Sequence, residues 1–148
     1  NELSHVGAKL LIETILKLES GELQPEVQDH TQSSLAPMLS KDMGKIDWSL
    51  PALTIHNLVR GLYPWPGTFT KYGDTALKVL KTSPAGTTSE GKSVGEVLVA
   101  DSKILIACGA EGQDRLELVS VQPANKGRMS ARDWANGVRI HPGDVLVS

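Results

Sequence analysis

Hydrophobic and polar positions follow two different patterns along the chain. Residues 4–20 place apolar side chains three and four positions apart, as one face of a helix does, and Gly21 follows as a stop signal. Residues 22–45 are polar, interrupted by proline and without a sustained period, which is typical of a linker. The apolar stripe of the helix is wide and the linker offers nothing to cover it. We therefore expect this helix to pack on a domain that is absent from this chain.

The remainder of the chain predicts one helix followed by short strands. Ser49 is suited to cap a helix and Pro51 to its first turn, and apolar residues recur at helical spacing as far as Leu62. Pro64 and Pro66 then end the helix, because each pushes its preceding residue out of helical geometry. Six β-type runs follow, at residues 68–73, 76–82, 95–100, 103–109, 115–122 and 144–148.

These elements define the expected fold class, which is mainly β with helices. Six short strands after one helix predict a small open β-barrel of the oligonucleotide-binding-fold type. Within the last part of the chain, a basic loop at residues 122–130 leads into one further short helix that ends near Gly137. The linker and the unpartnered first helix precede this barrel.

One motif, "GTTSEGKS" at residues 86–93, matches the phosphate-binding pattern GxxxxGK[ST]. That chemistry needs the loop to open a helix, whose backbone N–H groups and positive end hold the phosphates. The residues after Ser93 instead alternate as a strand does, and Glu90 would direct negative charge at the phosphates. We interpret the motif as a flexible surface loop between two strands.

Composition narrows the class of protein. The 148 residues are 40% hydrophobic and 22% charged, as in soluble globular chains, and no apolar run approaches the roughly 20 residues of a membrane span. Glu2 stands where a signal peptide would carry positive charge, and the single Cys108 excludes an intrachain disulfide framework. A cytoplasmic location is therefore expected, with no membrane partner.

Charge is unevenly distributed along the chain. Residues 1–39 hold two lysines and six acidic residues, a net −4, whereas residues 40–148 hold thirteen Lys and Arg and eleven acidic residues, a net +2. The larger segment is thus faintly basic. This balance is too weak to indicate nucleic-acid binding, because such domains usually have a pI above about 9 or a clear basic stripe.

No catalytic or metal site emerges from the residue pattern. The four histidines are isolated, without a partner three or four positions away and without a second cysteine, so no metal is expected. No Ser, His and Asp arrangement can be argued from spacing. The histidines concerned are His5, His30, His56 and His141.

Two stretches, "KIDWSLPALTIHNLVRGLYPWPGTFT" and "QPANKGRMSARDWANGVRIHPGDVL", resemble the C-terminal part of the methionyl-tRNA formyltransferase family. The resemblance extends from end to end. It implies that residues 1–21 are the terminal helix of a missing catalytic domain, residues 22–45 a linker, and residues 46–148 the C-terminal barrel domain. Formyltransferases that act on sugar nucleotides or on formyl-tetrahydrofolate share the "PWPG" region, and a domain that only braces such an enzyme remains the alternative.

The resemblance implies a division of labour within the full-length enzyme. That enzyme transfers a formyl group from 10-formyltetrahydrofolate to methionine on initiator tRNA in translation initiation, and its catalytic residues lie in the N-terminal domain. We therefore expect no catalytic residue and no cofactor in this chain, which alone would be inactive. Its partners would be initiator methionyl-tRNA and the missing catalytic domain.

A tRNA holder needs spaced Lys and Arg side chains at modest density, because affinity comes from counterion release at phosphates. We expect this role for five residues in the linker, the closing loop and the closing helix: Lys41, Lys45, Lys126, Arg128 and Arg132. A second candidate strip consists of Lys71, Lys78 and Lys81, with the first and last of these expected to be neighbours across a hairpin. The aromatic residues Tyr63, Trp65, Phe69 and Tyr72 are expected to pack the core rather than to stack on bases.

Overall fold

A computed structural model describes residues 2–148, which fall into two compact units that divide after Pro37. The first unit holds helix α1 (Glu2–Glu19) and a 3-10 turn, η1 (His30–Gln32). Helix α1 confirms the helix predicted at residues 4–20. It ends as predicted at Gly21, whose positive φ of 76° allows the amides of Gly21 and Glu22 to bond back to the carbonyls of Leu18 and Lys17.

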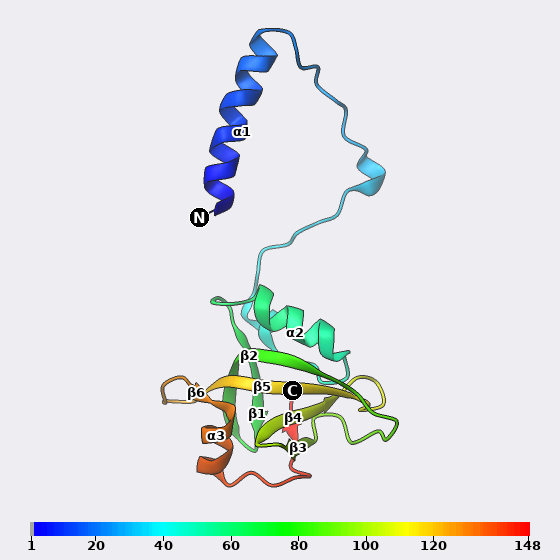
Figure 1. The fold of residues 1–148 in the computed structure, drawn as a ribbon, viewed down its shortest axis with the longest axis vertical. Helices are drawn as coiled ribbons and strands as arrows, with labels where there is room; N and C mark the ends of the chain where they lie inside the picture. Colours follow the sequence, from blue (N-terminus) through cyan, green and yellow to red (C-terminus); the bar gives the residue numbers. More distant parts are fainter. Residues whose placement is uncertain (1) are drawn as a thin grey trace. The chain divides into compact units, whose positions relative to one another are not determined.

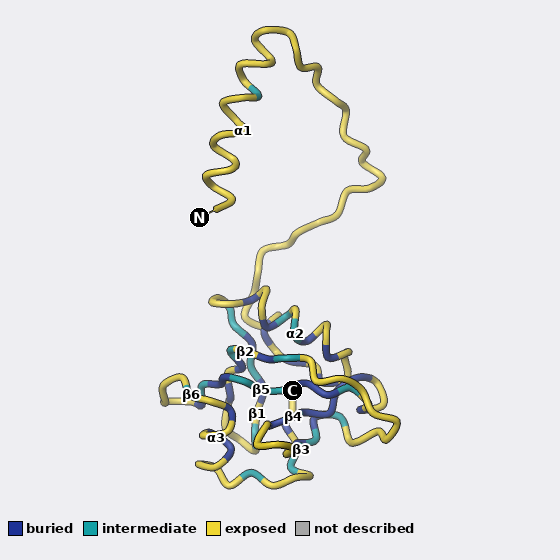
Figure 2. Tube along the Cα trace, viewed as in Figure 1, coloured by how far each residue is buried: buried dark blue, intermediate teal, exposed yellow. Residues whose placement is uncertain are grey.

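The apolar side chains of α1 lie on the surface of this unit. No residue of the helix is buried (Figure 2). The exposed large apolar residues of the helix are Leu3, Val6, Leu10, Leu11, Ile12, Ile15, Leu16 and Leu18. An apolar face of this size on a short helix requires a covering partner in water.

The second unit begins with a 3-10 turn, η2 (Lys41–Gly44), and helix α2 (Ala52–Gly61). The predicted Ser49 cap is wrong, because Ser49 donates its amide and hydroxyl to Asp47 Oδ1 at 2.9 and 2.6 Å. The first turn of α2 is instead capped from a distant strand, since the Ala52 amide donates to Asp114 Oδ2 at 2.9 Å. These two contacts fix where the chain enters the helix.

All six predicted strand regions form strands, and one additional short strand, β6, appears. The strands are β1 (Thr68–Tyr72), β2 (Thr75–Thr87), β3 (Val97–Ala100), β4 (Lys103–Cys108), β5 (Asp114–Pro123), β6 (Met129–Ser130) and β7 (Leu146–Val147). They pair in the order β3-β4-β5-β2-β1-β7, with β6 beside β5, and every named pair is antiparallel. The sheet curls below α2, with helix α3 (Ala131–Val138) beside β5 and β6 (Figure 1).

The two ends of the curled sheet are joined by backbone contacts. Glu96 bridges Val145, and the Leu146 amide donates to the Gly95 carbonyl at 2.9 Å. Gly95 has a φ of +85°, and a side chain there would collide with the Leu146 carbonyl oxygen. This near-closure confirms the predicted fold class, a small open barrel with helices.

The hydrophobic core fills the barrel and the interfaces of the sheet with α2 and α3. Its largest fully buried side chains include Ile46, Trp48, Ile55, Leu77, Ile106, Leu116 and Leu146. On the α3 side, Trp134 meets Tyr72 edge to face at 5.8 Å. The Tyr72 hydroxyl donates to Asp144 Oδ2 at 2.8 Å, and so does the His141 amide. Both hydrogen bonds lower the pKa of Asp144, and the bond from the His141 amide has the larger effect. The bond between Tyr72 and Asp144 also raises the pKa of Tyr72.

The phosphate-loop-like segment lies between β2 and β3 and opens no helix, which confirms the structural reason for rejecting the motif. Its exposed residues are held by Arg115, which is only 6% exposed. The guanidinium donates to the Gly112 and Asp114 carbonyls at 2.7 and 2.9 Å and to Thr88 Oγ1 and the Glu90 carbonyl at 3.0 and 3.1 Å. Two of these four hydrogen bonds anchor the loop, and the other two hold the guanidinium on the turn before β5.

Candidate nucleic-acid interface

A row of four side chains, three of them polar, crosses the sheet perpendicular to its strands. Lys45 bridges Phe69 of β1, Phe69 lies opposite Lys78 of β2, and Lys78 lies opposite Gln122 of β5. Residues directly opposite each other on paired strands share one face of the sheet. Lys45 and Lys78 are exposed, whereas their strand neighbours Ile46 and Val79 are buried, so this face is the solvent side.

A second lysine of the sheet joins this row from the next position along β1. Lys71 lies opposite Ala76 of β2. Ala76 is two residues before Lys78, so both side chains lie on the same face of β2. The two lysines are therefore diagonal neighbours across the hairpin. The expectation that Lys71 neighbours Lys81 is wrong, because Lys71 lies opposite Ala76 and the pairing of β1 with β2 runs only from Thr75 to Val79 of β2.

Arg128 reaches the same region from the loop between β5 and β6. Its Nε donates to Ser120 Oγ at 2.9 Å, which fixes the plane of the guanidinium beside β5. The loop itself is held by Gln122, whose Nε2 donates to the Lys126 carbonyl at 2.9 Å. The sheet and this loop together produce what we call the basic face, formed by Lys45, Lys71, Lys78 and Arg128.

The cations of the basic face have no carboxylate partner within ion-pair distance. Across residues 2–148 the ion pair within 4.0 Å joins Lys103 and Glu117, outside this face. The nearest acid along the chain, Asp47, has a lowered pKa because Ser49 donates two hydrogen bonds to it, with a smaller contribution from the charge of Lys45. The positive charges of the basic face are thus available to phosphates.

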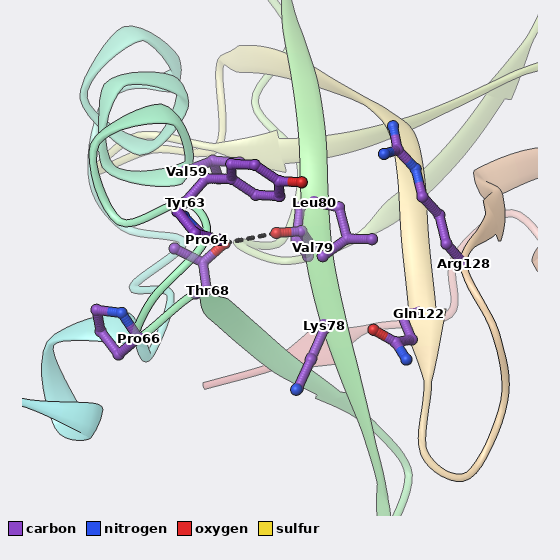
Figure 3. Close-up of a pocket in the computed structure, with 11 residues that line it drawn as sticks. Val59, Tyr63, Pro64, Pro66, Thr68, Lys78, Val79, Leu80, Gln122 and Arg128 are labelled. Atoms are coloured by element: carbon purple, nitrogen blue, oxygen red, sulfur yellow. Dashed lines mark hydrogen bonds between the residues drawn. The ribbon is translucent and has the colours of Figure 1, made fainter. Parts of the chain in front are cut away.

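A hollow of about 280 Å³ lies within this region. Its floor is β2, including Leu80, and the Tyr63–Gly67 corner forms one wall while Gln122 and Arg128 form the other (Figure 3). Leu80 is the extra residue of a β-bulge, because Val79 pairs with Val121 and Lys81 with Ser120. The corner is anchored by Thr68, whose hydroxyl donates to the Val79 carbonyl at 2.7 Å. No carboxylate lines the hollow.

The structure brings together only part of the predicted set. Lys45 and Arg128 belong to the basic face, as described above. Lys41 begins η2 and is exposed, and Arg132 lies on the exposed side of α3. Lys126 lines two adjoining hollows beside Trp134. The roles of these five residues in RNA binding stay predictions.

The aromatic residues of the proline corner do not pack the core as expected. Tyr63 is 56% and Trp65 57% exposed. Phe69 is partly buried, and Tyr72, which lies outside the corner, packs against the core as expected. Both peptide bonds that precede the corner's prolines are cis. Sequence reasoning missed this exposure because it took aromatic residues crowded around a proline-rich turn as core residues.

Among residues 2–148, no group of three or more His, Cys, Asp or Glu side chains is placed to hold a metal ion. Burial raises the pKa of the Cys108 thiol to about 12, which keeps it protonated and unreactive. In the same part of the chain, no helix is long and apolar enough to span a membrane.

Comparison with known proteins identifies the family to which this chain belongs. Residues 38–139 match the formyl transferase C-terminal domain, and the chain therefore belongs to this family. Its curated relatives are methionyl-tRNA formyltransferases. That of Solibacter usitatus is 42% identical over 97% of this chain, and that of Caldanaerobacter subterraneus is 35% identical over 99%. The chain spans 45% and 46% of the lengths of these two relatives.

Solved structures support the fold. A variant of HypX from Aquifex aeolicus matches 91% of this chain and 24% of its own, with a TM-score of 0.57 at 16% identity. HypX in complex with tetrahydrofolic acid matches 95% of this chain and 26% of its own, with a TM-score of 0.56 at 14% identity. At such low identity these matches establish a shared architecture only.

Proposed function

We propose that residues 46–148 form the tRNA-holding domain of a methionyl-tRNA formyltransferase. The observation that carries the proposal is the basic face, where Lys71, Lys78 and Arg128 gather with Lys45 at the end of the linker. No carboxylate lines the hollow beside Lys78 and Arg128. Family membership and the names of the curated relatives support the same role. The full-length enzyme would transfer a formyl group from 10-formyltetrahydrofolate to methionine on initiator tRNA.

The physical contribution of this domain is affinity rather than chemistry. Each phosphate neutralised by Lys or Arg releases condensed counterions. A plot of the logarithm of the binding constant against the logarithm of the salt concentration therefore has a slope of about −0.9 per phosphate contact on a duplex. Four cations on one face therefore predict a slope of about −3 to −4 if each contacts one phosphate. Phosphate contacts carry no sequence information directly, so initiator and elongator tRNA should bind alike.

The catalytic groups would come from a preceding domain, and the chain alone would be inactive. The exposed apolar face of α1 supports this arrangement, because residues 1–21 would be covered as the terminal helix of that domain. Residues 22–45 would then be the linker. Binding of the tRNA body by the barrel would hold the acceptor end near the catalytic domain and raise its local concentration there.

The second candidate is a domain that only braces the catalytic half of a related formyltransferase. The exposed Tyr63, Trp65 and Leu53 favour it, because side chains of this kind are common at protein interfaces. The two candidates differ in whether the isolated chain binds RNA. They can therefore be separated by a binding measurement without the catalytic domain.

The test is binding of initiator and elongator tRNA to this chain across a salt series. We expect log-linear weakening with salt for both, and the Lys78→Gln variant should reduce the slope by about 1. Lys92→Gln is the matched control, because Lys92 is equally exposed but lies beside Gly112, at the opposite end of β5 from Gln122. Absence of binding at low salt, or equal effects of the two variants, would reject the holder and favour the brace.

A further inference from the structure

The hollow beside Tyr63 contains more than a phosphate contact requires. A phosphate needs only the cations Lys78 and Arg128, whereas this hollow adds an exposed aromatic ring and the half-buried Leu80. In Figure 3 the ring of Tyr63 lies beside β2 on one side of Leu80, and the guanidinium of Arg128 lies on the other. A flat apolar group therefore has a surface on which to rest between the aromatic corner and the polar wall of Gln122 and Arg128.

The polar groups of the hollow are held in place by neighbouring residues. Arg128 is fixed through Ser120 Oγ, and Gln122 is fixed through the Lys126 carbonyl. That bond uses Gln122 Nε2, while the carbonyl oxygen of the side chain points toward Lys78 across the hollow (Figure 3). Side-chain amides of this kind hydrogen-bond to base edges, and cations to the adjoining phosphate. The walls thus present one acceptor and two cations to the same space.

The size of the hollow limits what it can hold. Its volume of about 280 Å³ lies just below the range of about 300–1,000 Å³ typical of small-molecule sites. This is room for one base with its sugar, but a base pair within a helix cannot enter. Unpaired nucleotides can leave their helix, and proteins stack them on aromatic side chains.

We propose that this hollow binds a single unpaired nucleotide of the RNA, with the base against Tyr63 and Leu80 and its phosphate between Lys78 and Arg128. The inference rests on the proposed function, since it assumes that RNA lies on the basic face. It adds a contact that depends on stacking and not on salt. The holder would then recognise a bulged or looped-out nucleotide as well as backbone charge.

The experiment compares two RNA probes that differ in one nucleotide. One is a duplex of about 16 base pairs, and the other is the same duplex with a single bulged adenosine. The full chain should bind the bulged duplex more tightly by roughly 5- to 150-fold, the range measured for one base stacked on an aromatic ring. Tyr63→Ala should abolish this preference and Tyr63→Phe should retain it, while both leave the salt slope for the uninterrupted duplex unchanged.

The outcomes separate this inference from the proposed function. Equal affinity for the two duplexes, with tRNA still bound in a salt-dependent manner, overturns the inference that the hollow binds a nucleotide. The proposed tRNA-holding function then stands, and Tyr63 faces a protein partner. A bulge preference that survives Tyr63→Ala also overturns the inference, because the nucleotide then binds elsewhere. If the chain binds neither duplex and no tRNA, both the inference about the hollow and the proposed function are overturned. Tyr63 is 56% exposed, so a thermal unfolding curve should confirm that its variants fold.

Discussion

Replacement of Arg115 by methionine removes a buried cation from the turn that anchors the loop between β2 and β3. The guanidinium donates four hydrogen bonds, two of them to the backbone carbonyls of Gly112 and Asp114. The other two acceptors belong to Thr88 and Glu90, which are exposed. Water can replace the guanidinium at the exposed acceptors but less readily at the buried Gly112. The loss of stability should therefore come mainly from the hydrogen bonds to the Gly112 and Asp114 carbonyls.

The magnitude follows from these two bonds. A hydrogen bond that involves a charged group contributes about 1.5–3 kcal/mol. Methionine keeps most of the apolar stem of arginine in place, which offsets part of the loss. We expect Arg115→Met to lower the free energy of unfolding of the barrel by about 2–4 kcal/mol. The segment at residues 86–93 should also become more susceptible to limited proteolysis, because its anchor is gone.

The assay is urea unfolding followed by tryptophan fluorescence, which reports on the barrel through the buried Trp48 and Trp134. Arg60→Met is the matched control, because Arg60 is exposed on α2 and its replacement should change stability by less than about 0.5 kcal/mol. A midpoint for Arg115→Met equal to that of the control would refute the reasoning, since it would mean that the four bonds contribute nothing net.

Three further predictions concern the backbone, the thiol and the titrating pair. Gly95→Ala should destabilise the barrel by about 2–4 kcal/mol in the same assay because of its φ of +85° and the collision with β7, whereas Gly61→Ala, where a side chain meets nothing within 4 Å, should stabilise α2 by about 0.5–1 kcal/mol. Cys108, with its pKa raised to about 12, should resist iodoacetamide at pH 8 until urea unfolds the chain, and rapid labelling of the folded chain would contradict its burial. The lowered pKa of Asp144 gives stability that is lost as the pH falls below about 4, and the raised pKa of Tyr72 gives stability that is lost above about pH 10. Tyr72→Phe should therefore weaken both pH dependences of the unfolding midpoint, and unchanged curves would show that the hydrogen bond is not formed.

Local sequence patterns predicted the elements of this fold well. Helix α1 and its Gly21 end follow from apolar spacing and from the freedom of glycine at positive φ, both of which depend on neighbouring residues only. The strand pattern after Ser93 likewise predicted correctly that the motif at residues 86–93 opens no helix. Local patterns could not identify the cap of α2, because Asp114 lies 62 residues along the chain from Ala52, whose amide donates a hydrogen bond to it.

The candidate site was predicted less completely, because it depends on strand register. Lys45, Lys78 and Gln122 come from three distant segments, and only the pairing of β1 and β2 with their neighbours aligns them in one row. A shift of one residue would turn Lys78 to the opposite face. The bulge at Leu80 and the outward position of Tyr63 also arise from tertiary contacts, which have no local signal in the sequence.

The central claim, that the basic face holds tRNA, is tested most directly by mapping the contact. Elongator tRNA is titrated into the isotope-labelled chain at low salt, and the amide chemical shifts are followed residue by residue. The account predicts changes along Thr68–Tyr72, at residues 76–81 and at residues 120–128, and their reversal by added salt. Changes confined to α1 or to the loop at residues 86–93, or no changes at all, would contradict it.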